Sequence, residues 1–433
     1  MRIFSYQRIE KVTYITLILI GFSTFRFPLS VSAAAAAAEV YPVLTYRYDH
    51  YLFTINPNLL PSWRKTEEVW QYNGEEIHPP AMLRVDGDSI PDLPEGMVRS
   101  LRLIWNRDAI TETIAEIIAP SIDRSRGTVS IDTDTDGNII FDGVGLLGRT
   151  VDIAVVTSLT IEALEQNVSD IILPVSEQQP IIHVLDSTLS DRGITEVVTI
   201  GESNFAGSTV NRRHNIAVGL EKFNGHIIPQ DTVFSFNETL GPVNGATGYR
   251  KELVILGDKT LPDYGGGLCQ VSTTAYRGVW EYGFPIEQRR NHSFAVSYYA
   301  PQGTDATIYP PYTDIKFRND SSGDLLMQTY FEGDQAYFIY YGTKDDRMAE
   351  VIGPYVWDRR SPPVDRIEYT DTLAPGAKKK VGTAVPGMQA AWFRIVQSPD
   401  SEERTEPVYS FYEARPNFTQ VGKQLTIPSW IGE

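Results

Sequence analysis

The sequence predicts an α+β protein of several domains, with a core of antiparallel strands and a small all-β module near the C-terminus. Helical periods of three to four residues alternate with short strand-like segments through most of the chain. The runs LLMQTYF and AYFIYY are joined by E-G-D-Q, as in a β-hairpin. After the Pro-rich junction R-R-S-P-P-V, only alternating segments separated by Pro-Gly turns remain.

Five parts are expected along the chain. They are a signal peptide at 1–38, an irregular N-terminal module at 39–100, an α+β domain at 101–190, a larger α+β domain at 195–345 and an all-β module at 362–422. Removing the first part leaves about 395 residues, which at ~100 to 200 residues per domain is enough for two to four separate cores.

The first forty residues are typical of a cleavable export signal. Arg2, Arg8 and Lys11 precede the apolar run VTYITLILIGF, and the small residues of VSAAAAAAEV follow it. An uncleaved membrane anchor is the alternative, but the apolar run is shorter than the ~20 residues that a spanning helix needs. We therefore expect a secreted, extracytoplasmic protein that meets the membrane only during export. A lipid-modified N-terminus is excluded because no cysteine lies near the cleavage region.

The chain is strongly acidic and has a single cysteine. Its formal net charge of −17 becomes −20 once the four positive charges and one negative charge of residues 1–38 are removed. Such a surface repels nucleic acid and anionic lipid, so neither is an expected partner. Exported proteins usually pair their cysteines, so the lone Cys269 is either buried and inert or kept for its reactivity.

In the 101–190 domain, periodicity predicts a helix at 101–120, a hairpin at 128–143, a second helix at 151–166 and strands within 170–184. The run D-T-D-T-D-G from Asp132 resembles the start of a calcium loop. The twelfth position of such a loop needs an acid and is Gly143 here, so a tight hairpin turn is favoured.

In the 195–345 domain, the apolar spacing at 211–223, followed by Asn224-Gly225, predicts an amphipathic helix with a glycine stop. A second helix is expected at 269–283. Strands are expected at VFSFN, ELVIL, FAVSYY, TDIKFRN, LLMQTYF and AYFIYY, and in the C-terminal module at IEYTDTL, KKKVGTAV, AWFRIVQ and PVYSFYEA.

The stretch Y-G-G-G-L-C-Q-V-S-T places Cys269 in the first turn of its helix. Unpaired N–H groups and the helix dipole stabilise an anion there, which lowers the pKa of a thiol. The preceding Gly265, Gly266 and Gly267 would let a substrate backbone approach and could present N–H groups to an oxyanion. A small buried hydrophobic role is the alternative for a lone cysteine. Three successive glycines favour reactivity, since glycines offer no side chain to a core.

A thiolate nucleophile needs a group that handles protons. Of the six histidines, His292 in R-N-H-S-F is favoured because a helix–loop–strand return can bring it beside the start of the Cys269 helix, and His214 is the second candidate. Asp305, or a backbone carbonyl, could orient the imidazole.

Further residues are candidates for binding substrate. Arginines near the thiol or the histidine could neutralise a substrate carboxylate. The substrate-binding candidates beside the glycines are Gln270, Ser293, Arg290 and Arg212. No second cysteine or closely spaced histidine accompanies the thiol, so we expect no metal and no cofactor.

Residues 200–345 resemble the VanW domain of bacterial cell-envelope proteins. The motifs that carry the resemblance are R-R-H-N-I, P-Q-D-T-V-F-S-F-N, G-P-V-N-G-A-T-G-Y, Y-G-G-G-L-C-Q-V-S-T-T-A-Y, R-N-H-S-F-A-V-S-Y and G-T-D-A-T. The chain has Pro229-Gln230-Asp231 where the family usually has Pro-Gly, which affects only a turn. Residues 105–185, with G-L-L-G-R-T-V-D and I-I-L-P-V, resemble a peptidoglycan-binding domain that often precedes VanW. The C-terminal L-A-P-G, A-V-P-G and Y-S-F-Y resemble the G-five wall-associated module, which implies binding to N-acetylglucosamine polymers.

The VanW name derives from a glycopeptide-resistance (vancomycin-resistance) gene cluster, and the resemblance implies an L,D-transpeptidase of the cell wall. Cys269 would be the nucleophile and His292 the general base, with peptidoglycan stem peptides and glycan as partners. Loss of D-alanine would leave a thioester on the third residue of a stem peptide, which a neighbouring amine would resolve into a cross-link. Water in place of the amine would give a carboxypeptidase. A thiol endopeptidase and a non-catalytic wall-binding or scaffolding protein are the alternatives.

Overall fold

The computed structural model describes residues 40–77, 95–256, 259–398 and 402–423. The signal peptide expected at 1–38 lies outside these residues. Within the described part of the chain, no helix is both long and apolar enough to cross a membrane. The chain divides into two units, the first comprising Met1–Tyr46, Phe53–Ile114 and Ala154–Ile171, and the second Arg47–Leu52, Ala115–Ile153 and Ile172–Glu433.

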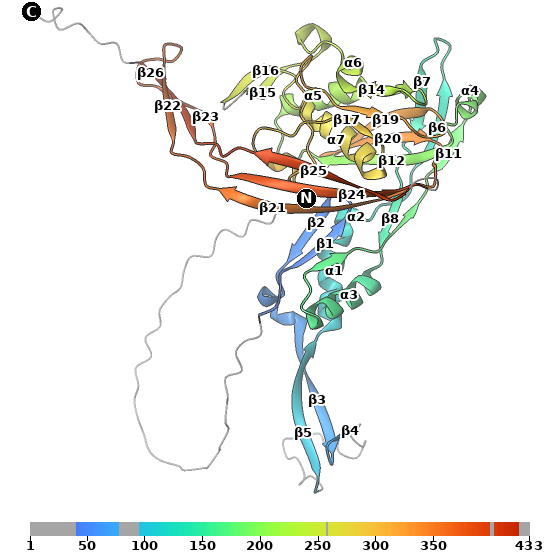
Figure 1. Ribbon diagram of the computed structural model, residues 1–433, viewed down its shortest axis with the longest axis vertical. Coiled ribbons are helices and arrows are strands. Elements are labelled where there is room, and N and C mark those ends of the chain that lie inside the picture. The colour runs from blue at the N-terminus through green and yellow to red at the C-terminus, as the bar shows by residue number, and fades with distance from the viewer. Residues whose placement is uncertain (1–39, 78–94, 257–258, 399–401, 424–433) are drawn as a thin grey trace, which may run out of the picture. The chain divides into compact units, whose positions relative to one another are not determined.

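Two three-stranded sheets, ordered β2-β1-β9 and β4-β3-β5, and the helices α1 and α3 form most of the first unit (Figure 1). Its core includes the fully buried Trp63, whose indole N–H donates to Thr113 Oγ1 at 2.9 Å. The elements are β1 Leu44–Tyr48, β2 Tyr51–Ile55, η1 Pro57–Leu59, η2 Pro61–Trp63, β3 Arg64–Tyr72, β4 Glu75–Ile77, β5 Met97–Trp105, α1 Arg107–Ile117, α3 Ile153–Glu165 and β9 Asp170–Ile172.

Two expectations for this part of the sequence are wrong. Residues 39–100 were expected to be irregular, and their described part contains strands. Residues 101–105 were expected to open a helix, and they form the end of β5 because their backbone pairs with Arg64–Glu68 of β3. The ladder with β3 overrides the local helical spacing, so α1 begins only at Arg107. The expected helix at 151–166 is confirmed as α3.

The second unit begins with small sheets ordered β11-β6-β7 and β10-β8. The hairpin expected at 128–143 is confirmed, and its turn is held by the Asp134 carboxylate, which accepts from the backbone N–H of Asp136 at 2.9 Å and Asn138 at 2.8 Å. The elements are α2 Ala119–Ile122, β6 Thr128–Thr133, β7 Ile139–Gly143, β8 Gly148–Val151, β10 Val175–Gln178, β11 Ile181–Val184 and α4 Ser187–Asp191.

The centre of the second unit is an antiparallel sheet ordered β12-β20-β19-β13, accompanied by the helices α5 and α7. Smaller antiparallel sheets, β14-β18-β17 and β15-β16, complete this region. The elements are β12 Glu196–Asn204, α5 Val210–Glu221, β13 Ile227–Ile228, β14 Val233–Ser235, α6 Phe236–Leu240, η4 Gly245–Thr247, β15 Lys251–Leu256, β16 Lys259–Tyr264, α7 Leu268–Tyr282, β17 Ile286–Gln288, η5 Ser297–Tyr299, β18 Lys316–Arg318, β19 Leu325–Glu332 and β20 Gln335–Gly342.

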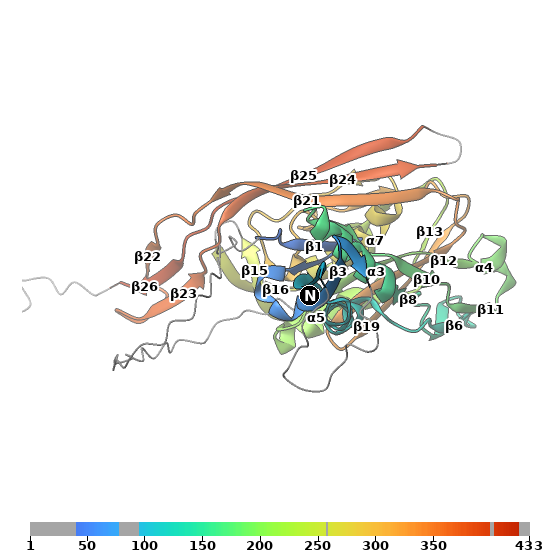
Figure 2. The ribbon, with the colours of Figure 1, turned by 90° about the horizontal axis from the view of Figure 1, so that it is seen from below.

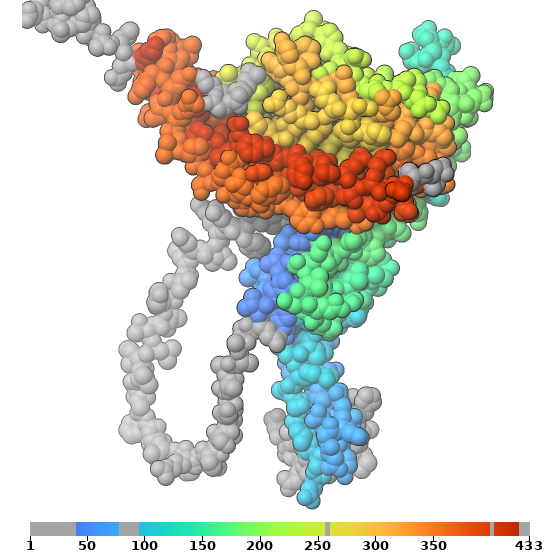
Figure 3. All heavy atoms as spheres, in the orientation of Figure 1, coloured from blue at the N-terminus to red at the C-terminus, as the bar shows by residue number. Residues whose placement is uncertain are grey.

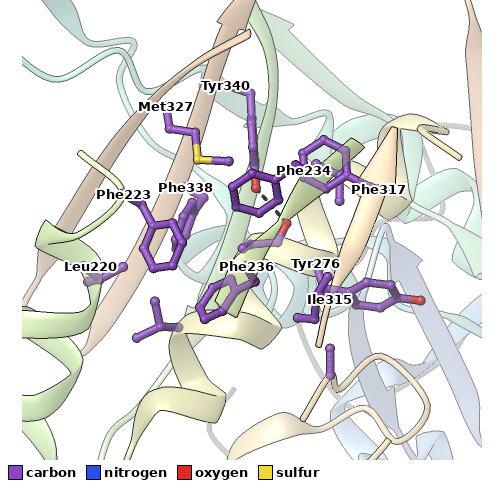
Figure 4. Packing of buried hydrophobic residues seen from close by; sticks show 14 of the residues in the cluster. Leu220, Phe223, Phe234, Phe236, Tyr276, Ile315, Phe317, Met327, Phe338 and Tyr340 are labelled. Atoms are coloured by element: carbon purple, nitrogen blue, oxygen red, sulfur yellow. Dashed lines mark hydrogen bonds between the residues drawn. The ribbon is translucent and has the colours of Figure 1, made fainter. Parts of the chain in front are cut away.

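Aromatic side chains fill the space between the central sheet and its helices (Figure 4). The ring of Phe223 lies 4.4 Å from that of Phe236 and 5.4 Å from that of Phe338, measured between centroids. Tyr340 is fully buried and satisfies its hydroxyl by donating to the carbonyl oxygen of Ala275 on α7 at 3.0 Å. The same core therefore fixes α5, α7 and the sheet together.

The helix α7 crosses β12 at unusually close range. A Cβ on Gly201 of β12 would lie 2.0 Å from the Thr274 carbonyl oxygen, and a Cβ on Gly278 of α7 would lie 2.5 Å from the Gly201 nitrogen. Glycine is needed at both positions because the two backbones occupy the space that side chains would take. The expected helices at 211–223 and 269–283 are confirmed as α5 and α7.

The C-terminal part of the second unit contains the sheets β21-β24-β25 and β22-β26-β23 (Figure 2). The four strands expected here are confirmed as β22 to β25, whereas β21 and β26 were not expected. Residues 294–299 were expected to be a strand and instead end in the 3-10 turn η5. The elements are β21 Met348–Arg360, β22 Arg366–Thr370, β23 Lys378–Gly382, β24 Gly387–Gln397, β25 Arg404–Tyr412 and β26 Phe418–Gly422.

The strand β24 is fixed directly to the end of α7. The buried guanidinium of Arg394 donates to the carbonyl oxygens of Trp280 and Phe284, each at 2.9 Å. Atoms of the C-terminal strands, orange to red, lie against the yellow region that contains α7 in Figure 3. The architecture agrees with the α+β class: it is strand-rich, multi-domain and built largely from small antiparallel sheets.

A buried network of charges lies on β12 and the end of α7. The carboxylate of Glu202 accepts hydrogen bonds from Arg149 at 2.5 Å, Arg124 at 3.0 Å and the Tyr51 hydroxyl at 2.9 Å. These partners outweigh the effect of burial and lower the pKa of Glu202 to about 2. Nearby, His50 Nδ1 lies 2.8 Å from Glu281 Oε1.

Candidate active site

The start of α7 is built so that Cys269 comes in its first turn. Gly267 precedes the helix with a φ of +118°, and Gly265 has a φ of +79°, so both adopt a conformation that side chains disfavour. The apolar stripe of α7, including Val271, Ala275 and Val279, is buried in the central core. The helix therefore has a fixed orientation, and the position of Cys269 follows from it.

The three glycines before Cys269 serve packing within the protein. A Cβ on Gly265 would lie 2.5 Å from Val243 Cγ1, one on Gly266 would lie 2.8 Å from Glu252 Cβ, and one on Gly267 would lie 3.0 Å from Arg212 Cγ. Two of the three are buried. Packing therefore accounts for these glycines, contrary to the expectation from the sequence, because neighbouring atoms fill the space that their side chains would take.

Cys269 is partly exposed and its sulfur has polar neighbours. Its Sγ lies 3.4 Å from Thr307 Oγ1 and 3.9 Å from the carbonyl oxygen of Ile308, and the His292 imidazole is near enough to affect its ionisation. Burial opposes ionisation of the thiol. The neighbouring His292 outweighs that effect, and together with Thr307 it lowers the pKa of Cys269 to about 7.

His292 is buried and held at three points. Its Nδ1 lies 2.6 Å from Asp305 Oδ2, its backbone N–H donates to the same oxygen at 2.7 Å, and its ring stacks on Tyr299 with centroids 4.5 Å apart. Because Asp305 occupies Nδ1, Nε2 is the ring nitrogen left to face the thiol. Burial would lower the pKa of His292, but Asp305 and Cys269 raise it to about 9.

Asp305 is buried, and both of its carboxylate oxygens have hydrogen-bond partners. Its Oδ1 accepts a hydrogen bond from the Tyr412 hydroxyl and lies 3.4 Å from Arg289 Nη2. Burial would raise the pKa of the carboxyl group, but His292 and Arg289 hold it well below the usual range. The structure therefore places Cys269 together with the hydrogen-bonded pair of His292 and Asp305, and His292 is near enough to the thiol to lower its pKa.

Of the substrate-binding candidates, Arg212 and Gln270 are engaged with the protein. Gln270 is fully buried, accepting from Arg212 at 2.9 Å and donating to Ser203 Oγ at 2.7 Å. Arg212 is nearly buried and its guanidinium lies 4.0 Å from the centre of the Tyr298 ring. Gln270 thus has no accessible face toward a substrate in this structure, and it supports Arg212.

The remaining candidates lie at the surface. The side chains of Arg290 and Ser293 are exposed on either side of His292. His214, the second candidate for the base, is hydrogen bonded through Nε2 to the carbonyl oxygen of Gly248 at 2.8 Å and is not among the partners of Cys269. Within the described residues, no group of three or more His, Cys, Asp or Glu side chains is arranged to hold a metal ion.

Three residues at this site were not among the candidate site residues chosen from the sequence. Thr307 contacts the sulfur, Tyr299 stacks on the imidazole and Tyr412 bonds to the acid. Thr307 and Tyr299 stand close to candidate residues in the chain. Tyr412 lies 107 residues beyond Asp305, in an alternating strand pattern that predicts burial but names no partner.

The arrangement is suited to nucleophilic acyl transfer. A thiolate paired with an imidazolium is the stable form between about pH 7 and about pH 9, given the pKa of Cys269 near 7 and that of His292 near 9. In the first turn of α7, the backbone N–H groups of Leu268 and Gln270 donate to the carbonyl oxygens of Gly265 at 3.0 Å and Gly267 at 2.9 Å, and the N–H of Cys269 itself lies between them. A nucleophile, a base and an orienting acid are therefore assembled at one place.

Comparison with known proteins identifies the region that carries this site. Residues 211–341 match the family model described as VanW like protein. The chain is 30% identical over 139 residues, 32% of the chain and 46% of the relative, to "Uncharacterized protein YoaR" of Bacillus subtilis (strain 168). It is 28% identical over 116 residues, 26% of the chain and 42% of the relative, to "Vancomycin B-type resistance protein VanW" of Enterococcus faecalis (strain ATCC 700802 / V583).

These matches support the VanW family for this region, which contains Cys269, His292 and Asp305 and excludes Tyr412. The chain spans a little under half the length of the curated relatives it matches. No solved structure matches it. The resemblances of the flanking segments to a peptidoglycan-binding domain and a G-five module stay predictions.

Proposed function

We propose that this protein is an exported cell-wall enzyme, a cysteine-dependent L,D-transpeptidase that acts on peptidoglycan stem peptides. The observation that carries the proposal is the grouping of the partly exposed Cys269, at the start of α7, with the hydrogen-bonded pair of His292 and Asp305. The VanW match of the same region, and a relative named for vancomycin resistance, support a place in the cell envelope.

The first half-reaction forms a thioester. The Cys269 thiolate attacks the carbonyl carbon of the amide that joins the third stem residue to D-alanine, and the backbone N–H of Cys269 in the first turn of α7 stabilises the oxyanion. The His292 imidazolium then gives its Nε2 proton to the departing amine. The carbon–nitrogen bond breaks, D-alanine leaves as a neutral amine, and His292 is left neutral.

The second half-reaction reverses the proton flow. Neutral His292 takes a proton from the acceptor amine as its nitrogen attacks the thioester carbonyl, and the carbon–sulfur bond breaks to regenerate the thiolate beside the imidazolium. Asp305 keeps Nδ1 protonated through both halves, so that Nε2 alone exchanges protons. Water in place of the amine would release a free tripeptide stem.

The test is covalent capture of the thiol. The purified full chain is incubated with a carbapenem or with a tetrapeptide-bearing muropeptide, and intact mass is recorded. We expect a single adduct on the wild type and none on Cys269→Ala, whose fold is checked by circular dichroism. If the folded wild type stays unmodified by both reagents, the covalent mechanism is wrong.

Product analysis separates the related activities. New cross-linked dimers indicate transpeptidation, free tripeptides indicate a carboxypeptidase, and cleaved cross-links without new ones indicate an endopeptidase. If Cys269→Ala still restores a deletion strain and still sediments with purified sacculi, the protein acts by binding the wall.

A further inference from the structure

The loop that carries His292 is bonded along its length to the C-terminal strand β25. Asn291 Nδ2 donates to the carbonyl oxygen of Phe411 at 2.8 Å, and the Glu413 backbone N–H donates to the carbonyl oxygen of Ser293 at 2.7 Å. Arg289 Nη1 donates to Ser410 Oγ at 2.9 Å. The base is therefore held by a strand that lies outside the family match at 211–341.

The same strand reaches the acid. The hydroxyl of Tyr412 donates to Asp305 Oδ1 and accepts from the Gly303 backbone N–H at 2.7 Å. Tyr412 is only 1% exposed, so water cannot take the place of its hydroxyl. Burial and the Asp305 charge hold the pKa of Tyr412 well above 10, and the phenol therefore remains a donor throughout the working range of pH.

The two oxygens of Asp305 have separate partners. Oδ2 accepts both N–H groups of His292, and Oδ1 accepts the Tyr412 hydroxyl. A hydrogen bond from a phenol stabilises the carboxylate and draws charge toward Oδ1, which weakens the attraction of Oδ2 for the imidazolium. The hydrogen bond that Tyr412 donates to Asp305 thus weakens the interaction between Asp305 and His292.

We propose that Tyr412 is a positioning residue of the catalytic site, which limits the negative charge that Asp305 presents to His292 and makes the C-terminal sheet part of that site. This inference rests on the proposed function for its catalytic meaning. It concerns the charge balance of the Cys269–His292 pair, which can be measured without any substrate.

Removing the Tyr412 hydroxyl should change how the negative charge is distributed over Asp305, but it should leave the Asp305 carboxylate in place. The loop around Asp305 keeps its other anchors: Arg289 donates to the carbonyl oxygens of Asp305 at 2.8 Å and Gly303 at 3.0 Å, and Trp392 Nε1 donates to that of Gln302 at 2.8 Å. In Tyr412→Phe the Asp305 charge is drawn fully toward His292, which favours the imidazolium and hence the thiolate. Ionisation of Cys269 then moves to lower pH.

In such a variant the Gly303 N–H also loses its acceptor, whereas the charged groups around the pair are unchanged. The other charged groups near it are Arg289 on the same loop, Arg212 on α5 and Arg277 on α7. The substitution alters none of them.

The experiment measures the rate of iodoacetamide alkylation against pH in the full chain, by intact mass. Cys269 is the one cysteine in the sequence, so the adduct needs no site assignment. The wild-type midpoint is expected near 7. For Tyr412→Phe we expect the midpoint lower by about half a unit or more, equivalent to about threefold more thiolate below the midpoint. Tyr409→Phe, which removes the same atom from an exposed ring on the same strand, should keep the wild-type profile.

A second substitution should shift the pH midpoint of Cys269 alkylation in the opposite direction. Replacing Tyr412 with 3-fluorotyrosine keeps the ring and the bond but makes the phenol a stronger donor, so the midpoint should rise. If Tyr412→Phe does not fold, the alkylation midpoint of the 3-fluorotyrosine variant tests the proposal by itself. An unchanged midpoint in both variants, or a rise in Tyr412→Phe, overturns the proposal.

A failure of the proposed function would instead appear in the alkylation midpoint of the wild type. If the wild-type thiol itself ionises no lower than an ordinary cysteine, at about 8.5, the activated nucleophile is lost whatever Tyr412 does.

Discussion

At the scale of single residues, the reactivity of Cys269 depends on its neighbours more than on its place in a helix. The main effect that lowers the pKa of the thiol is the neighbouring His292, followed by the contact with Thr307. His292 can have that effect only because Asp305 keeps the imidazole protonated up to about pH 9. The acid therefore controls the thiol although the two are not in contact.

Asp305→Asn should deactivate the thiol. The amide carries no charge, so the pKa of His292 falls and the imidazolium that stabilises the thiolate is lost. The pKa of Cys269 should then rise from about 7 toward the ordinary value of about 8.5, and alkylation at pH 7 should slow by about tenfold. The measurement is the iodoacetamide rate across pH.

Asp314→Asn is the matched control for that substitution. Asp314 is also buried, and its carboxylate accepts from Ser235 Oγ at 2.6 Å and from the Asn237 backbone N–H at 2.9 Å, but Cys269 and His292 are not among its partners. We expect lower stability with an unchanged alkylation midpoint. An unchanged midpoint in Asp305→Asn as well would remove Asp305 from the site.

At the scale of elements, the contact of α7 with β12 decides where the thiol lies. Alanine normally stabilises the middle of a helix relative to glycine by about 1 kcal/mol. At Gly278 the sign should reverse, because the added Cβ would lie 2.5 Å from the Gly201 nitrogen and 2.9 Å from its Cα. These are backbone atoms of β12, which is paired with β20 and packed against α7, so they cannot move aside cheaply.

Gly278→Ala should therefore destabilise the protein by about 3 kcal/mol or more, as measured by urea unfolding. Gly333→Ala is the control, at the β19–β20 turn, where φ is +56° but nothing lies within 4 Å of the added Cβ. Backbone strain alone should cost about 1 kcal/mol there. A stabilised Gly278→Ala would mean that α7 and β12 do not approach as closely as described.

Elements with a strong local pattern could be predicted from the sequence, and elements fixed by distant partners could not. The helices α5 and α7 and the β19–β20 hairpin follow from apolar spacing and turn residues. Residues 101–105 have helical spacing but belong to β5, because a nine-residue ladder with β3 outweighs local preference. Residues 294–299 alternate like a strand, yet their backbone ends in a 3-10 turn beside His292.

In the candidate site, too, some residues could be chosen from the sequence and others depend on distant packing partners. Cys269, His292 and Asp305 lie within 37 residues of one another and could be chosen by residue type and motif, because few residue types can act as a nucleophile, a base and an orienting acid. The role of the three glycines and the contact of Tyr412 depend on which segments pack together. Neither could be inferred from one sequence without the fold.

At the scale of the whole molecule, buried charge makes stability depend on pH. Glu281, at the end of α7, has a side chain only 9% exposed, and it faces His50, Arg277, Glu202 and Arg149. Burial, reinforced by Glu202 against the effect of Arg277, raises the pKa of Glu281 to about 8 from an ordinary 4.5. The pKa of His50 is lowered well below 6.5, mainly by burial, so the pair is neutral in the folded protein near pH 7.

The direction in which Glu281 changes stability with pH follows from proton binding. The folded protein keeps a proton on Glu281 that the unfolded chain releases above about pH 4.5, so this stabilisation is complete below that pH and is lost as the pH rises through 8. Glu281→Gln removes the titration and keeps a group that can donate to neutral His50. Its free energy of unfolding relative to wild type should therefore increase with pH, by up to about 1.4 kcal/mol per unit between about pH 5 and about pH 8.

Glu202→Gln is the matched control, because the same substitution on a neighbouring buried glutamate should act in the opposite direction. Glu202 is ionised and bonded to two arginines, so a neutral amide leaves buried positive charge uncompensated and should cost about 3 to 5 kcal/mol. Urea unfolding of the full chain across this pH range measures both variants. If Glu281→Gln loses stability as the pH rises, or parallels the wild type throughout, Glu281 is ionised in the folded protein and forms an ion pair with His50 or Arg277.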